Sequence, residues 1–227
     1  MKIKYAFTLS EVLIALVVIG VIAAITVPAL MNNINNNQYK SALKKNYAVI
    51  SEAFRLAYGY DYDDFRDWNY SHTKEFTKEV YNKISKYLYH SKNCGYIYES
   101  GAECWADKTY AKNGQYSLGF NNGTWSGGQE GYSFLLNDGT VIIYDICAGN
   151  TMRNYLGIYD NLFENNANLC IYIDLNGKRG PNTFGKDMYA FGLIQKGIVP
   201  AGIDNKSQNC DNKNTNNNFD CTAKMLK

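Results

Sequence analysis

Residues 7–31 read FTLSEVLIALVVIGVIAAITVPALM, and this stretch decides how the chain is organised. From Val12 to Met31 it contains no charged side chain. At 1.5 Å per residue, that run forms a helix about 30 Å long, which matches the thickness of the hydrocarbon core of a membrane. The segment therefore predicts a membrane-spanning helix.

The competing interpretation is a secretory signal that is removed. Val27, Pro28 and Ala29 loosely resemble a small-residue cleavage site. The apolar region of a secretory signal is usually shorter, about 7–15 residues, so the length of the run favours a segment that is retained.

Glu11 stands at the edge of this apolar helix, where burying a carboxylate is costly unless a partner compensates its charge. Two partners fit the sequence. If the chain is cut after Ala6, the new amine of Phe7 lies about one helical turn from Glu11, in the same chain or in a neighbouring copy. Alternatively, Thr8 and Glu11 form a capping box that satisfies backbone N–H groups at the helix start.

The N-terminal sequence resembles the class III signal of type IV prepilins and type II secretion pseudopilins. The resemblance rests on a short basic leader over residues 1–6, followed by Phe7 to Glu11 and an unbroken apolar helix. It implies that prepilin peptidase cuts between Ala6 and Phe7 and methylates the new Phe7 amine. Glu11 then falls at the fifth mature position, where the family keeps a glutamate. Two residues depart from the family pattern, because Ala6 replaces the usual glycine and Ser10 replaces a commonly aliphatic residue.

Gly20 and Pro28 stand where many members of the family carry a glycine and a proline that loosen the helix. Pro28 lacks an N–H, and its ring clashes with the carbonyl four residues earlier, so it weakens the helix locally. In a simple membrane anchor this is a tolerated bend. In a filament subunit it lets the helix stretch when packed, and we favour this second interpretation.

Residues 32–58 predict that the helix continues with one apolar face. Apolar or aromatic side chains recur at helical spacing, at Tyr39, Leu43, Tyr47, Ile50, Phe54 and Ala57. We expect this face to pack on a globular domain formed by residues 59–227, as in the helical spine that the pilin family shares.

The globular region predicts a pilin-like α+β fold. A second helix is expected from Thr73 to His90, with an apolar face. Two strands joined at Asn137-Asp138-Gly139 predict a β-hairpin. Helices followed by strands indicate an antiparallel sheet laid across the long helix. The expected strands cover residues 116–120, 132–136, 140–146, 169–175 and 188–194.

The cysteines lie in the C-terminal two thirds of the chain, and none forms a Cys-x-x-Cys pair. With only two histidines present, this pattern argues against a zinc site. An even number of cysteines after an export-like segment favours disulfides over the alternative of buried free thiols in the cytosol. Because short loops close most easily, we expect neighbours to pair: Cys94 with Cys104, Cys147 with Cys170 and Cys210 with Cys221.

One loop offers oxygen ligands suited to calcium. Residues 174–187 read DLNGKRGPNTFGKD, and the hard oxygen donors are Asp174, Asn176, Asn182 and Asp187. The spacing is not that of an EF-hand, because no glutamate follows at the required position. Major pseudopilins are similar in carrying a calcium loop between C-terminal strands. The alternative is a turn-rich connection in which these residues serve backbone geometry, and basic residues in the same loop oppose a cation.

Charge and motif content exclude two classes of function. The chain has 23 basic and 21 acidic residues and no basic stripe, which argues against a nucleic-acid-binding protein. No Gly-x-Ser-x-Gly, P-loop, dinucleotide fingerprint or His-Glu-x-x-His sequence occurs. We therefore predict that the chain is not an enzyme.

The resemblance implies a structural subunit of a type II secretion pseudopilus or a type IV pilus, and the calcium loop and disulfides incline the prediction toward the pseudopilus. Expected partners are other copies of the chain or related pilins, prepilin peptidase and the inner-membrane assembly platform. The chain is expected in the inner membrane, with residues 59–227 outside the cytoplasm, and then in a periplasmic or extracellular filament. The alternative is a minor pilin or a membrane-anchored binding module whose aromatic side chains contact a surface, a sugar or DNA.

Overall fold

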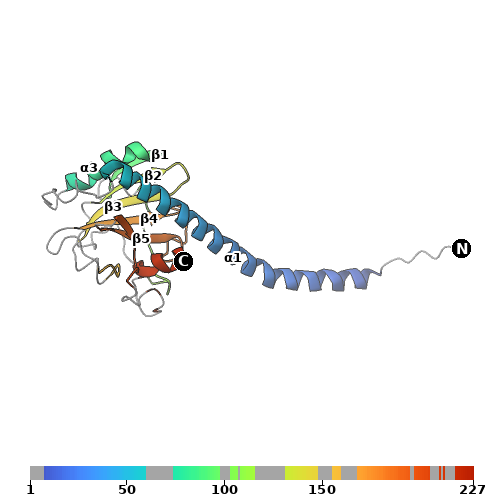
Figure 1. The fold of residues 1–227 in the computed structure, drawn as a ribbon. Coiled ribbons are helices and arrows are strands. Elements are labelled where there is room, and N and C mark those ends of the chain that lie inside the picture. The colour runs from blue at the N-terminus through green and yellow to red at the C-terminus, as the bar shows by residue number, and fades with distance from the viewer. Residues whose placement is uncertain are drawn as a thin grey trace. The chain divides into compact units, whose positions relative to one another are not determined.

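The fold of the chain is that of a computed structural model (Figure 1). It describes residues 8–59, 74–97, 103–106, 108–115, 131–147, 155–159, 168–194, 197–204, 210, 212 and 218–227. The strand expected at residues 116–120 and the processing residues Ala6 and Phe7 lie outside these ranges. Helix α1 covers Leu9–Tyr58 and is shared between two compact units, one ending at Tyr39 and the other beginning at Lys40.

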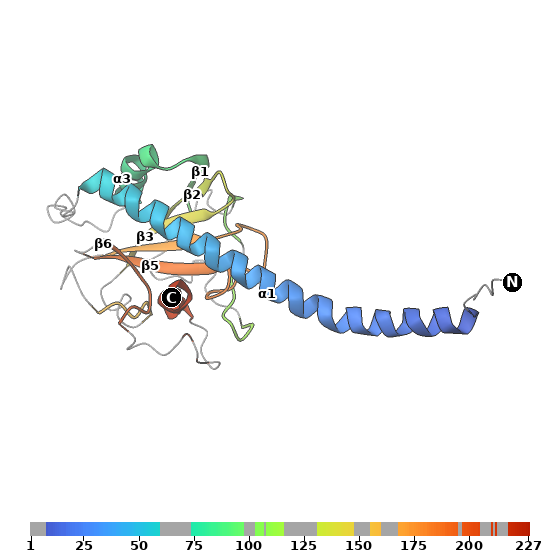
Figure 2. The ribbon, with the colours of Figure 1, turned by 45° about the vertical axis from the view of Figure 1, so that its right-hand side comes forward.

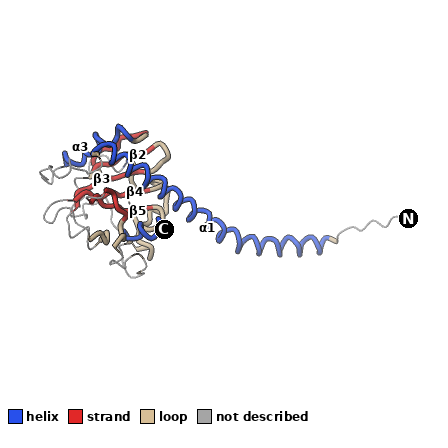
Figure 3. Tube along the Cα trace, viewed as in Figure 1, coloured by secondary structure: helices blue, strands red, loops and turns tan. Residues whose placement is uncertain are grey.

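The second unit is built on a six-stranded antiparallel sheet in which every strand pairs with its neighbour in sequence (Figure 3). The hairpin turn forms as expected, with Gly139 at a φ of +91° and its N–H donating to the Leu136 carbonyl. The strands are β1 His90–Tyr96, β2 Tyr132–Leu136, β3 Val141–Cys147, β4 Asn168–Asp174, β5 Met188–Ile194 and β6 Gly197–Pro200.

One face of the sheet is covered by the Lys40–Tyr58 part of α1 and by α3, Lys74–Ile84 (Figure 2). Leu43, Ile50 and Phe54 of the predicted stripe are fully buried. The Phe54 ring meets the edge of Tyr144 on β3 at 5.6 Å between centroids. The expected α+β arrangement, with an antiparallel sheet against the helix, is therefore confirmed.

The opposite face of the sheet has a core of its own, which the sequence did not predict. It is filled from β3 and β4, from loops, and from the C-terminal segment that contains the short helix α5, Thr222–Leu226. Since both faces are covered, every residue of β3 is buried. The largest side chains in this second core are Trp105, Tyr172, Phe184 and Phe219.

The predicted second helix is too long. It ends at Ile84 and is followed by a 3₁₀ turn, Ser85–Tyr87, and by an extended backbone at Leu88. His90, expected to be helical, instead begins β1 and pairs with Leu136. The apolar periodicity continues to Leu88, but pairing with a distant strand outweighs that local preference.

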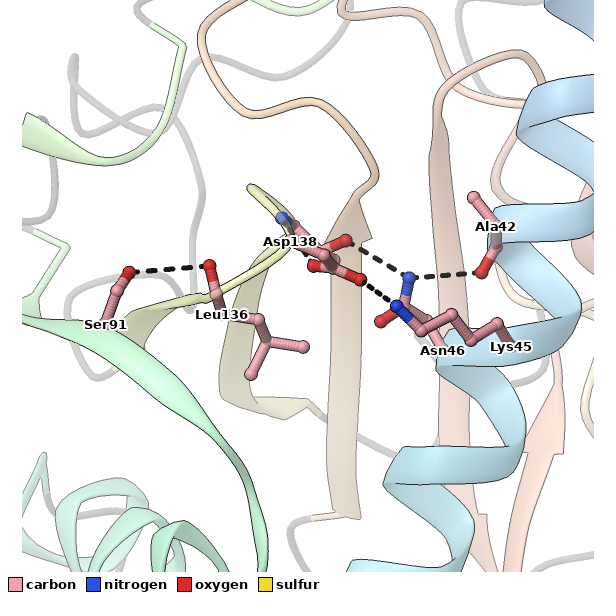
Figure 4. Close-up of polar contacts among 7 residues, drawn as sticks. Ala42, Lys45, Asn46, Ser91, Leu136 and Asp138 are labelled. Carbon is pink, nitrogen blue, oxygen red and sulfur yellow. Dashed lines mark hydrogen bonds and ion pairs between the residues drawn. The ribbon is translucent and has the colours of Figure 1, made fainter.

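A small polar cluster fixes α1 to the hairpin turn (Figure 4). Asn46 is 1% exposed, and its amide donates to the Ala42 carbonyl at 3.0 Å and to the Thr140 hydroxyl at 3.1 Å. Beside it, Lys45 forms a 2.9 Å ion pair with Asp138. Burial opposes ionisation of Asp138, but hydrogen bonds from Lys45 and Thr140 outweigh it and hold the pKa of Asp138 below its usual value.

Replacing Asn46 with alanine is expected to lower the free energy of unfolding by about 1–3 kcal/mol, because the Thr140 hydroxyl loses a buried partner. Urea unfolding measures the change. Val49→Ala is the matched control, because Val49 lies on the same helix but is 39% exposed, and its effect should be within about 0.5 kcal/mol. Equal losses in the two variants would contradict a specific role for the buried amide.

Candidate functional site

The first candidate site is the N-terminal half of α1. The 20 residues from Leu9 to Pro28 form a helix long and apolar enough, by length and composition, to cross a membrane. Large apolar side chains are exposed all round it, among them Leu13, Val17 and Ile25. A helix that is apolar on all sides needs lipid or other apolar helices around it.

At the start of this helix, Thr8 and Glu11 form both halves of a capping box. The Thr8 N–H and hydroxyl donate to Glu11 Oε2 at 2.8 and 2.7 Å, and the Glu11 N–H donates to Thr8 Oγ1 at 3.3 Å. One of the two partners expected for Glu11 is therefore present. Pairing with the amine of Phe7 remains a prediction, because Phe7 lies outside the described residues.

Gly20 and Pro28 both lie inside the continuous helix. A Cβ added at Gly20 would meet nothing within 4 Å, so packing within this chain does not require a glycine there. Pro28 has no N–H to donate, which leaves the helix one hydrogen bond short at that turn. Their role in loosening the helix remains a prediction.

The second candidate site is the loop of residues 174–187, which joins the end of β4 to the start of β5. It brings together the four predicted oxygen donors. Asp187 is buried and accepts hydrogen bonds from the Asn182 N–H at 2.8 Å and the Thr183 N–H at 2.7 Å. Asn176 donates to the Gly180 carbonyl at 3.2 Å and also hydrogen-bonds with Asp187. Backbone and side-chain groups of the loop thus hydrogen-bond to the carboxylate of Asp187.

The oxygen atoms of this loop that are buried without a hydrogen-bond partner include Asp174 Oδ2 and Asn182 Oδ1. Asp174 is fully buried, and its Oδ1 accepts from the Asn176 N–H at 3.1 Å, while its Oδ2 has none. Asn182 Oδ1 is also buried and unpartnered, on a backbone with a φ of +50°. Buried polar atoms nearly always have partners, so these two oxygens require an explanation.

Burial and mutual repulsion act on the two carboxylates of the loop. Burial, and then the charge of Asp187, raises the pKa of Asp174 well above its usual value. Burial also raises the pKa of Asp187, against the lowering effect of the Thr183 and Asn182 N–H groups. A cation between the two carboxylates would offset both the burial and the mutual repulsion.

The basic residues that weigh against a cation point into solvent, since Lys178, Arg179 and Lys186 are all exposed. Within the described ranges, no group of three or more His, Cys, Asp or Glu side chains could hold a metal. The loop therefore offers two carboxylates, and a metal there would depend on amide and backbone oxygens as well. Calcium accepts such a mixed oxygen set.

Three disulfides close the loops expected from cysteine spacing. They join Cys94 to Cys104, Cys147 to Cys170 and Cys210 to Cys221.

Sequence reasoning missed the polar anchor at Asn46. Its signal was a polar residue on the buried side of the helix, between Leu43 and Ile50.

A comparison with family models matches residues 1–27 to the prokaryotic N-terminal methylation motif. Neither the curated proteins nor the solved structures compared with the chain give a match. The matched segment contains the capping box and most of the membrane-length helix, and the rest of the chain supplies the antiparallel sheet and the disulfides. The chain therefore begins with the N-terminal methylation motif that type IV prepilins and pseudopilins carry, and a long apolar helix and an antiparallel sheet domain with disulfides follow it.

Proposed function

We propose that this chain is a structural filament subunit, of a type II secretion pseudopilus or a type IV pilus, which performs no catalysis. The family's motif in general implies processing by prepilin peptidase and assembly into filaments that contain pilins. Processing in this chain falls between Ala6 and Phe7, and the Leu9–Pro28 helix holds the subunit in the inner membrane before assembly.

The observation that carries this proposal is the exposed apolar helix that follows the motif. Its side chains find no partners of their own within the described residues, and they fit two surroundings equally well, lipid before assembly and the helices of neighbouring subunits afterwards. A subunit that moves between the two needs no catalytic group.

Calcium binding by the 174–187 loop is the second part of the proposal. Asp174 Oδ2 and Asn182 Oδ1 supply unpartnered oxygens, and Asp187 supplies a second buried carboxylate. The ion would stabilise the loop and, through β4 and β5, the sheet that it joins. This loop and the three disulfides favour the pseudopilus over the pilus.

The test is isolation of sheared filaments. The proposal expects the processed chain in the sedimenting fraction, and none there when prepilin peptidase is inactive. A processed chain that stays in the membrane while filaments form without it would overturn the structural role. The alternative of a minor pilin or anchored binding module predicts instead a scarce subunit, present in few copies per filament.

A further inference from the structure

The 174–187 loop is held from outside by two segments that are distant in sequence. On one side, the Tyr110 N–H donates to the Asn182 carbonyl at 2.8 Å, and the Phe184 N–H donates back to the Tyr110 carbonyl at 2.9 Å. These two bonds flank Thr183, whose N–H holds Asp187. The position of Tyr110 therefore affects the hydrogen bond from the Thr183 N–H to the Asp187 carboxylate.

On the other side, the C-terminal segment packs directly against the loop. The Phe184 ring lies 4.2 Å from that of Phe219, edge to face. Gly185 approaches the side chains of Lys112 and Cys221 so closely that an added Cβ would lie 2.6 Å from Lys112 Cε and 2.8 Å from Cys221 Sγ. Gly185 also has a φ of +78°, which disfavours any other residue. The sulfur of Cys221 thus forms part of the wall behind the loop.

Lys112 connects the two supports. Its N–H donates to Asn218 Oδ1 at 2.8 Å, and its ammonium group donates to the Cys210 carbonyl and lies 3.3 Å from Cys210 Sγ. Since Cys210 and Cys221 are bonded to each other, the disulfide ties the segment at Lys112 to the wall at Gly185. The supports on the two sides of the loop are therefore linked through the Cys210–Cys221 bond.

We propose that the Cys210–Cys221 disulfide is a clamp that fixes the 174–187 loop and sets its affinity for calcium. The inference rests on the calcium proposal above. The two cysteines are positioning residues, because they act on the oxygen donors only through Gly185, Phe184 and the residues beside Tyr110. Removing a residue that holds a metal ligand in position commonly lowers the affinity for the metal by about 10–100-fold.

The test compares two double variants of the full chain in detergent. Cys210→Ser/Cys221→Ser removes the clamp. Cys147→Ser/Cys170→Ser is the matched control, because that disulfide lies at the end of β3 and β4 away from Asp174. Calcium affinity is measured by titration, and hydrogen exchange of the Asn182 and Thr183 amides is measured without calcium.

The clamp variant is expected to lose amide protection at residues 182 and 183 and to bind calcium about tenfold or more weakly. The control should keep both properties, although both variants melt at lower temperature. If the clamp variant does not fold, Gly185→Ala tests the same contact from the loop side and should have the same two effects.

Three results would overturn the inference. Unchanged amide protection and calcium affinity in the clamp variant, or equal losses in the control, would overturn it alone. A wild-type chain that binds no calcium would overturn the calcium proposal, and the inference with it.

Discussion

Replacing Glu11 with glutamine is expected to lower incorporation of the chain into filaments about tenfold or more, while the sheet domain stays folded. Glutamine can make the same capping-box contacts with Thr8, since the motif accepts either residue. The substitution removes only the negative charge of Glu11, which is expected to pair with the Phe7 amine. A charge-assisted hydrogen bond contributes about 1.5–3 kcal/mol, and each 1.4 kcal/mol corresponds to a tenfold change.

The matched control is Thr8→Ala, which removes the cap and keeps the charge. Loss of an N-cap costs about 1 kcal/mol of local helix stability, and the membrane or filament around the helix supplies far more. Incorporation of Thr8→Ala should therefore stay close to wild type. Quantifying both variants in sheared filaments separates the two partners proposed for Glu11. Normal assembly of Glu11→Gln would contradict charge pairing and favour the capping role.

The second large effect concerns Asp174. A hundredfold excess of calcium over its dissociation constant is expected to stabilise the wild-type chain by about 2.7 kcal/mol, which corresponds to roughly 5–10 °C in melting temperature. Asp174→Asn should abolish most of this shift. Without calcium, the variant should melt no lower than wild type, because the amide removes a buried charge next to Asp187.

Asp138→Asn serves as its control, because Asp138 is a carboxylate outside the loop that already pairs with Lys45. This variant should keep the full calcium shift, and a chelator should reverse the shift in both wild type and control. No calcium shift in wild type, or an equal shift in Asp174→Asn, would mean that the loop residues serve only backbone geometry.

The elements that the sequence predicted best have strong local signals. The stripe of Leu43, Ile50 and Phe54 follows helical spacing, and all three side chains are buried. The Asp138-Gly139 turn sits between two apolar runs, and β2 has the expected bounds. The short separations between neighbouring cysteines likewise identify the pairs, because loop-closure entropy favours them.

What the sequence did not reveal depends on distant partners. Only Cys94 of strand β1 is buried, and the pairing of β1 with β2 is irregular, so its residues lack the alternation of a regular strand. The second core is assembled from loops and from the C-terminal segment around Phe219, where no periodicity announces burial.

The candidate loop was predictable in its ligands but not in its support. Asp174, Asn176, Asn182 and Asp187 are visible as oxygen donors on a glycine-rich segment. That Asp174 keeps one buried oxygen unpartnered, and that Cys221 packs behind Gly185, follow only from the folded chain.

The most direct test of the whole account is the intact mass and N-terminal sequence of the membrane-extracted chain, from cells with and without active prepilin peptidase. The account predicts a chain that begins at Phe7 and carries one added methyl group, and that appears only when the peptidase is active. A chain that begins at Leu30, or that still begins at Met1 when the peptidase is active, would contradict it.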